Sequence, residues 1–179
     1  MSKLENKSAL VTGASRGIGR GIAEGLAEAG ATVGVNYPSE SEEEHAARVV
    51  ETIEDEGGDA FTLKADVTEE TQVEEMIETF EAQAGTIDVL VNNAGILTQS
   101  ELVEMPVEMW DETMAVDLRG VFLTTRFTLP GMLEQGDGKI INIASQLGFK
   151  GSEELVHYSA AKGGVIAMTR ALAREVSPD

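Results

Sequence analysis

Short apolar runs alternate along this chain with longer segments in which apolar residues recur at helical spacing. The short runs are almost continuously apolar and rich in β-branched residues, which is typical of strands buried on both faces of a parallel sheet. Several of the longer segments begin at Ser, Thr or Pro and end at glycine, as helices do. We expect strands over residues 8–11, 32–36, 60–65, 87–91 and 139–144. We expect helices over residues 18–29, 39–56, 68–83, 106–133 and 155–176, with a loop over 96–105.

This alternation predicts an α/β domain, a doubly wound parallel sheet with helices on both faces and the strand order 3-2-1-4-5. The length of 179 residues fits a single domain, and no linker, repeat or low-complexity tract divides it. In open sheets of this kind, ligands bind at the carboxyl ends of the strands, where the strand order reverses. We therefore expect the site between the first and fourth strands.

Composition narrows the possible functions. The net charge is −19, from 32 acidic and 13 basic residues, so we expect no nucleic-acid partner, because a basic surface is needed to neutralise phosphates. Cysteine is absent, which excludes disulfides and thiolate metal sites, and we expect no bound metal. No apolar run has the length of a membrane span and the first residues lack a signal-peptide pattern, so we expect a cytoplasmic protein without a membrane partner.

The acidic residues are concentrated in three stretches, residues 40–44, 51–56 and 69–81. We interpret these stretches as solvated faces of helices. A second interpretation is adaptation to high salt, in which an acidic surface stays hydrated and its self-repulsion is screened. The two interpretations differ in the expected salt dependence of stability.

A glycine-rich turn, TGASRGIG over residues 12–19, follows the first predicted strand and leads into a helix. Glycine permits a tight turn and lets a pyrophosphate approach backbone N–H groups, while the helix N-terminus adds the positive end of its dipole. An ordinary glycine-rich turn is the alternative. The position between a strand and a helix favours dinucleotide binding. The contacts would come from Gly13, Ser15, Arg16, Gly17, Ile18 and Gly19.

Tyr158 and Lys162 lie one helical turn apart in the last predicted helix, so their side chains project from the same face. A cation beside a phenol favours the phenolate, and we expect Lys162 to lower the pKa of Tyr158 and to suit it to acid/base chemistry. The other tyrosine, Tyr37, has no such partner. Without further motifs, a pair of this kind is more often an accident of a solvated helix.

Together, the G-x-x-x-G-x-G spacing and the Tyr-x-x-x-Lys pair resemble the Rossmann-like short-chain dehydrogenase/reductase family, in a motif style similar to that of its 3-oxoacyl-thioester reductases. Further matches follow in the family's order. Asp66-Val67 ends the third strand, Asn92-Asn93-Ala94-Gly95 ends the fourth, and Ser145 follows the fifth, thirteen residues before Tyr158. The resemblance covers nearly the whole chain, from about residue 3 to the end.

The resemblance implies hydride transfer between a nicotinamide cofactor and a carbonyl or secondary alcohol. It implies that Tyr158 exchanges a proton with the substrate oxygen and that Lys162 stabilises the phenolate and binds the nicotinamide ribose. Ser145 would hold the substrate oxygen; the alternative is a turn hydroxyl that caps local backbone. Further cofactor contacts are implied for the residues that end the third and fourth strands: Asp66, Val67, Asn93, Ala94 and Gly95.

Asp117 stands where the family usually has an asparagine that binds a water in the proton relay. An ionised aspartate accepts hydrogen bonds but donates none. It could also pair with Lys162 and hold it charged. We retain Asp117 as a fourth catalytic candidate.

The end of the second strand bears on the choice of cofactor. An acidic residue there would bond the ribose 2′-hydroxyl and repel a 2′-phosphate, whereas this chain has Asn36. Arg16, inside the glycine turn, is placed to meet a phosphate. We therefore predict NADP(H) in preference to NAD(H), with NAD(H) as the alternative.

The last predicted helix carries small residues that allow close approach of another helix: Ala160, Ala161, Gly163, Gly164 and Ala167. They would pack either on the chain's own sheet or, as the family resemblance implies, across a two-fold axis in a homodimer or homotetramer. The family normally continues beyond this helix with a sixth strand, a nicotinamide loop, a substrate lid and a seventh strand. We therefore expect a form truncated at the C-terminus.

Several functions remain open from the sequence. The leading prediction is an NADP(H)-dependent reductase of 3-oxoacyl thioesters, and sugar or polyol dehydrogenases share every motif. A cofactor-binding protein without turnover is a second alternative. A third is a fragment that persists only as an assembly partner, which would expose apolar area beside the fifth strand.

Overall fold

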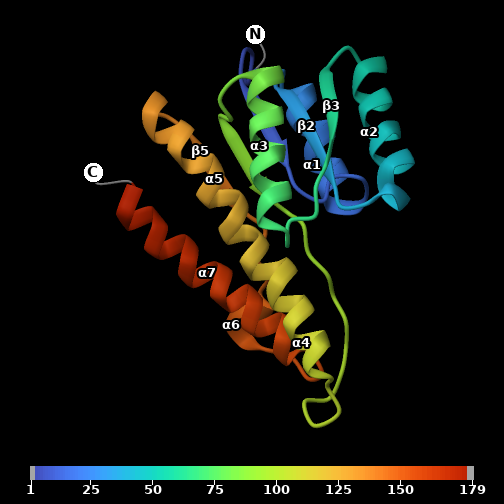
Figure 1. Cartoon of the computed structure of the whole chain (residues 1–179), viewed down its shortest axis with the longest axis vertical. Helices are drawn as coiled ribbons and strands as arrows, with labels where there is room; N and C mark the ends of the chain where they lie inside the picture. The colour runs from blue at the N-terminus through green and yellow to red at the C-terminus, as the bar shows by residue number, and fades with distance from the viewer. Residues whose placement is uncertain (1–2, 177–179) are drawn as a thin grey trace.

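The computed structural model of the chain describes residues 3–176, whose central sheet lies between two layers of helices (Figure 1). The sheet has five strands, all paired in parallel in the order β3-β2-β1-β4-β5. The strands are β1 (Ser8–Val11), β2 (Thr32–Tyr37), β3 (Asp59–Lys64), β4 (Val89–Asn92) and β5 (Lys139–Asn142). The predicted fold class and strand order are confirmed.

The main helices occupy the predicted segments. They are α1 (Gly17–Glu28), α2 (Glu43–Asp55), α3 (Glu70–Ala84), α4 (Val107–Met114), α5 (Gly120–Gln135) and α7 (Val156–Val176). The single long helix predicted over 106–133 is observed as α4 and α5 joined by a π-helical turn, η2 (Ala115–Arg119). Such wide turns re-aim side chains and often occur at functional sites.

Two hydrophobic cores, one on each face of the sheet, explain why the strands are continuously apolar. On β1, Ala9 and Val11 face the core shared with α1 and α2. Leu10, between them, faces the opposite core, where it joins Phe80 of α3 and Leu123 of α5. Alternate residues of a strand point to opposite faces, so both faces need apolar side chains.

The start of the helix predicted over 39–56 is observed as the 3-10 turn η1 (Glu40–Glu42), and one short element was not predicted, the helix α6 (Leu147–Lys150). The start of α6 is held by Ser145, whose hydroxyl accepts a hydrogen bond from the Leu147 N–H at 3.1 Å. Gly148 of α6 packs against α7, where a Cβ atom would lie 2.8 Å from the backbone nitrogen of Gly163. A single turn of this length has too few residues for periodicity to reveal it.

Within residues 3–176, β5 pairs only with β4 and forms one edge of the sheet. Ile141 of β5 is 46% exposed. Exposed apolar area at this edge is what the assembly-partner alternative predicts.

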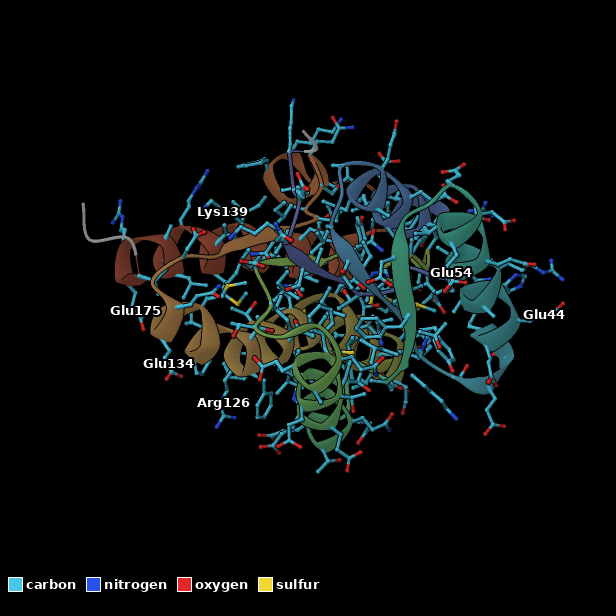
Figure 2. All side chains as sticks on the ribbon, turned by 90° about the horizontal axis from the view of Figure 1, so that it is seen from above. Glu44, Glu54, Arg126, Glu134, Lys139 and Glu175 are labelled. Atoms are coloured by element: carbon cyan, nitrogen blue, oxygen red, sulfur yellow. The ribbon has the colours of Figure 1, made fainter. Side chains whose placement is uncertain are left out.

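Charged side chains labelled in Figure 2 point away from the layers, with Glu44 and Glu54 on α2, Glu134 on α5 and Glu175 on α7. Glu44 and Glu54 belong to two of the acidic stretches, and their exposure agrees with the interpretation of these stretches as solvated helix faces. No helix in the described part of the chain combines the length and apolar character needed to cross a bilayer.

Candidate active site

A cleft of about 460 Å³ lies at the carboxyl ends of the strands, where the order reverses between β1 and β4. Its volume is in the range of small-molecule sites. All the predicted catalytic and cofactor-binding residues line it, except Gly17 and Ser145. The fold therefore gathers residues from the glycine turn, β2, the segments that follow β3 and β4, η2 and α7 at one place.

The glycine turn forms a tight cradle next to β4. Gly13 and Gly17 have φ angles of 60° and 59°, in the left-handed region that favours glycine. A Cβ atom on Gly19 would lie 2.4 Å from both Asn93 Nδ2 and the Gly13 carbonyl oxygen. Asn93 Nδ2 donates to the carbonyls of Thr12 and Gly13, at 2.9 and 3.1 Å, and so ties the turn to β4.

Asn36 borders the cleft, but its side chain is 1% exposed and bonded to backbone. Its Oδ1 accepts from the Gly13 N–H at 3.1 Å, and its Nδ2 donates to the carbonyls of Leu63 and Ala65 at 3.1 and 3.0 Å. Asn36 thus contributes to the site by fixing the glycine turn against β2 and β3, with no side-chain donor left free.

Glu42 is a cleft residue that the sequence analysis missed. Its side chain is 13% exposed; Oε1 lies 3.1 Å from Arg16 Nη2, and Oε2 accepts from the Ser15 hydroxyl at 2.9 Å. The interpretation of residues 40–44 as a solvated face is wrong for this residue. Nothing in the sequence distinguishes it from the exposed Glu43 and Glu44 beside it.

Other lining residues were also missed: Pro38, Ala65, Ile96, Leu97, Val116 and Ile143. Ile96 and Leu97 could have been found from their position in the sequence, because they directly follow the Asn-Asn-Ala-Gly motif. The loop that they open is anchored at Thr98, whose hydroxyl lies 2.9 Å from Nε2 of the buried His157. This contact holds the loop against the start of α7.

Tyr158 and Lys162 project together from α7, with the Lys162 Nζ 5.7 Å from the centre of the Tyr158 ring. The expected lowering of the Tyr158 pKa is not found. Burial raises the pKa of the phenol, a hydrogen bond from Ser145 lowers it in part, and the negative charge of Asp117 raises it. The sequence argument considered the cation alone and omitted both burial and the carboxylate that accompanies it.

Asp117 forms the predicted pair with Lys162, with Oδ2 3.2 Å from Nζ. Asp117 is 0% exposed, and its Oδ1 accepts from the Ile96 N–H at 2.8 Å. Burial raises the pKa of this carboxyl, while Lys162 and the Ile96 N–H act in the opposite direction. Lys162 also donates to the Ile143 carbonyl at 3.1 Å, so its ammonium group is held from both sides.

Ser145 has the turn-capping role that was the alternative for it, and its role towards the substrate oxygen stays a prediction. Its hydroxyl accepts from Leu147 at the start of α6, which is the turn-capping alternative. The same side chain lies near enough to Tyr158 to lower the pKa of the phenol in part. A hydroxyl can accept and donate at once, so the contact with Leu147 leaves the proton of Ser145 available to a second acceptor.

Comparisons with known proteins agree with this geometry. The family model for short chain dehydrogenases matches residues 7–179. A 3-oxoacyl-[acyl-carrier-protein] reductase FabG of Staphylococcus epidermidis (strain RP62A) is 45% identical over 172 residues, which are 96% of this chain and 70% of the relative. One from Staphylococcus aureus (strain Mu50) is 46% identical over 171 residues, 96% of this chain and 69% of the relative. The 3-oxoacyl-[acyl-carrier-protein] reductase of Synechocystis sp. (strain PCC 6803) is 43% identical over 177 residues, 99% of this chain and 71% of the relative. The chain therefore belongs to the short-chain dehydrogenase family of oxidoreductase enzymes.

Proposed function

We propose that this enzyme reduces the 3-oxo group of 3-oxoacyl thioesters to a secondary alcohol, with NADP(H) as the cofactor. The observation that carries the proposal is the position of Tyr158, which lines the same cleft as the glycine turn and lies beside Lys162 and Ser145. The names of the relatives support the substrate class. Acyl carrier protein, or a smaller carrier of the thioester, is the corresponding partner.

The residues of the cleft fit a dinucleotide. Gly13 and Gly19 leave the backbone uncovered where a pyrophosphate would approach. The N-terminus of α1 is directed to the same place. Arg16 would meet a 2′-phosphate. Asp66 and Val67 border the part of the cleft assigned to adenine, and Lys162 would bind the nicotinamide ribose. When bound, the nicotinamide supplies the hydride.

Tyr158 would give its proton to the alkoxide that develops on the substrate. Its raised pKa keeps the phenol protonated at neutral pH, as an acid in the reduction must be. The Ser145 hydroxyl would hold the substrate oxygen, and the Lys162 ammonium would stabilise the phenolate left behind. Asp117 holds Lys162 in place through the ion pair. Acid catalysis by a positioned group contributes about 10²–10⁴-fold.

The test is oxidation of NADPH in the presence of 3-oxoacyl thioesters, with NADP⁺ reduction by sugars and polyols measured in parallel. We expect turnover of thioesters with NADPH and none with the sugars or polyols. Turnover of a sugar or polyol alone would instead support the alternative dehydrogenase. Saturable NADPH binding without any turnover would support the cofactor-binding form without activity.

We also propose that the enzyme assembles as a homodimer or homotetramer through α5 and α7. Of the small residues on α7, Ala161 is buried and Gly163 and Gly164 face other parts of the chain, which leaves Ala160 and Ala167 exposed. Exposed apolar side chains accompany them, Phe122 on α5 at 47% and Phe149 on α6 at 69%. Light scattering across a concentration series would detect the assembly, and a monomer at all concentrations would contradict it.

A further inference from the structure

We propose that Glu42 competes with the 2′-phosphate of NADP(H) for Arg16 and Ser15, and that this competition sets how strongly the enzyme distinguishes NADP(H) from NAD(H). The inference rests on the dinucleotide function proposed above. It assigns a specificity-determining role to Glu42. This residue lies six positions beyond Asn36, the position near the end of the second strand where an acidic residue would favour NAD(H).

The carboxylate of Glu42 uses both oxygens on the glycine turn. Arg16 Nη2 lies 3.1 Å from Oε1, and the Ser15 hydroxyl donates to Oε2 at 2.9 Å. These are the two polar side chains of the turn that the sequence analysis assigned to the cofactor. Glu42 thus holds, within the protein, the contacts that an anionic group of the ligand would need.

Accessibility also favours competition. The Arg16 side chain is 73% exposed, so it is free to turn towards a ligand, whereas the Glu42 side chain is only 13% exposed and borders the cleft. A phosphate monoester carries up to two negative charges and three acceptor oxygens. It would have to take Arg16 from Glu42 and lie beside an unpaired carboxylate, and both effects oppose binding.

Among residues 3–176, the other basic side chains near the start of α2 already have acidic partners. Lys64 pairs with Glu40 at 3.2 Å, and Arg48 pairs with Glu44. Release of Arg16 to a phosphate would therefore leave the charge of Glu42 without a replacement partner among these basic side chains.

The same carboxylate is compatible with NAD(H). A ribose 2′-hydroxyl is a neutral donor, so it can share the carboxylate without displacing Arg16, as an acid near the ribose does in NAD-binding domains. Glu42 therefore lowers affinity for the phosphorylated cofactor and leaves affinity for NAD(H) equal or higher. The preference for NADP(H) that Arg16 provides is reduced as a result.

The experiment compares the wild-type enzyme with Glu42→Gln and Glu42→Ala, and with Glu44→Gln as a matched control. Glu44 lies two residues further along, in the first turn of α2, and Glu44→Gln makes the same change of charge, but Glu44 does not border the cleft. Calorimetry measures dissociation constants for NADPH and NADH. It also measures the dissociation constants of 2′,5′-ADP and 5′-AMP, two fragments that probe the 2′-phosphate without the nicotinamide.

We expect Glu42→Gln to lower the dissociation constants of NADPH and 2′,5′-ADP by about fivefold or more. The dissociation constants of NADH and 5′-AMP should be unchanged or higher. Glu42→Ala should act in the same direction, and Glu44→Gln should leave the NADPH/NADH ratio within about twofold of the wild-type ratio. An unchanged ratio in both Glu42 variants, or an equal shift in Glu44→Gln, would overturn the role of Glu42 alone. A wild-type enzyme that binds neither dinucleotide would overturn the proposed function, and this inference with it.

Discussion

Asp117 and Lys162 form a buried ion pair at the wall of the candidate site, with Oδ2 and Nζ 3.2 Å apart and side chains 0% and 5% exposed. The π-helical turn η2 carries the aspartate and α7 carries the lysine, so the pair joins two elements that the chain places 45 residues apart. Removing one partner from such a pair costs more free energy than the pair itself contributes, because a buried charge is left alone.

Replacement of Asp117 by Ala should lower the free energy of unfolding by about 3–5 kcal/mol. Asp117→Asn should cost less, because the amide oxygen can still accept the Ile96 N–H and the volume is kept. Urea denaturation followed by circular dichroism measures both. A loss below about 1 kcal/mol in Asp117→Ala would mean that Lys162 does not depend on this carboxylate.

The same pair predicts a change in pH dependence. The negative charge of Asp117 raises the pKa of Tyr158, after burial, so Asp117→Asn should lower it. Alcohol oxidation requires the phenolate and therefore rises with pH through the Tyr158 pKa. The rising limb of kcat should move to lower pH in Asp117→Asn, as measured by NADP⁺ reduction across a pH series. A limb at the same or higher pH would contradict this electrostatic link.

The glycine turn makes a prediction with an internal control. In Gly19→Ala the new methyl group would meet Asn93 Nδ2 and the Gly13 carbonyl at 2.4 Å, so the turn must shift and dinucleotide affinity should fall at least about tenfold. At Gly21, on the same helix, such a methyl group would meet no atom of another described part of the chain within 4 Å. Gly21→Ala should therefore keep the affinity and stabilise the protein by about 0.5–1 kcal/mol. Equal affinities in the two variants would contradict the cradle.

The sequence was sufficient for the fold because the signals were redundant. Leu10 and Val11 of β1 point to opposite faces of the sheet, and both are apolar. Only a sheet covered by helices on both faces buries both side chains. Most of the site followed as well, since its motifs end strands or begin helices. Gly13, Asn93 and Tyr158 could therefore be assigned to one cleft before any geometry was known.

What could not be predicted depends on partners distant in the chain. The direction of the Tyr158 pKa is set by burial, by Ser145 and by Asp117, none of which is visible from a four-residue spacing. Glu42 has acidic neighbours of the same type, and only the path of η1 turns this one side chain towards Arg16. Periodicity describes a face of a helix, and it does not identify the one residue on that face that meets another element.

The net charge of −19 predicts a dependence of stability on salt. Screening weakens repulsion among carboxylates such as those on α2 and α3, so the melting temperature should rise between about 0.05 M and about 1 M NaCl. Unfolding in dilute buffer with recovery in molar salt would support adaptation to high salt. Full stability in dilute buffer would leave the acidic stretches as ordinary solvated helix faces.

The most direct test of the account is the rate of NADPH oxidation with a 3-oxoacyl thioester by the wild-type enzyme and by Tyr158→Phe, each with its NADPH dissociation constant. The account predicts that the variant binds NADPH within about threefold of the wild-type affinity and loses about 10²–10⁴-fold or more in kcat, because only the proton donor is removed. Unchanged turnover in Tyr158→Phe would contradict the assignment of Tyr158 as the acid.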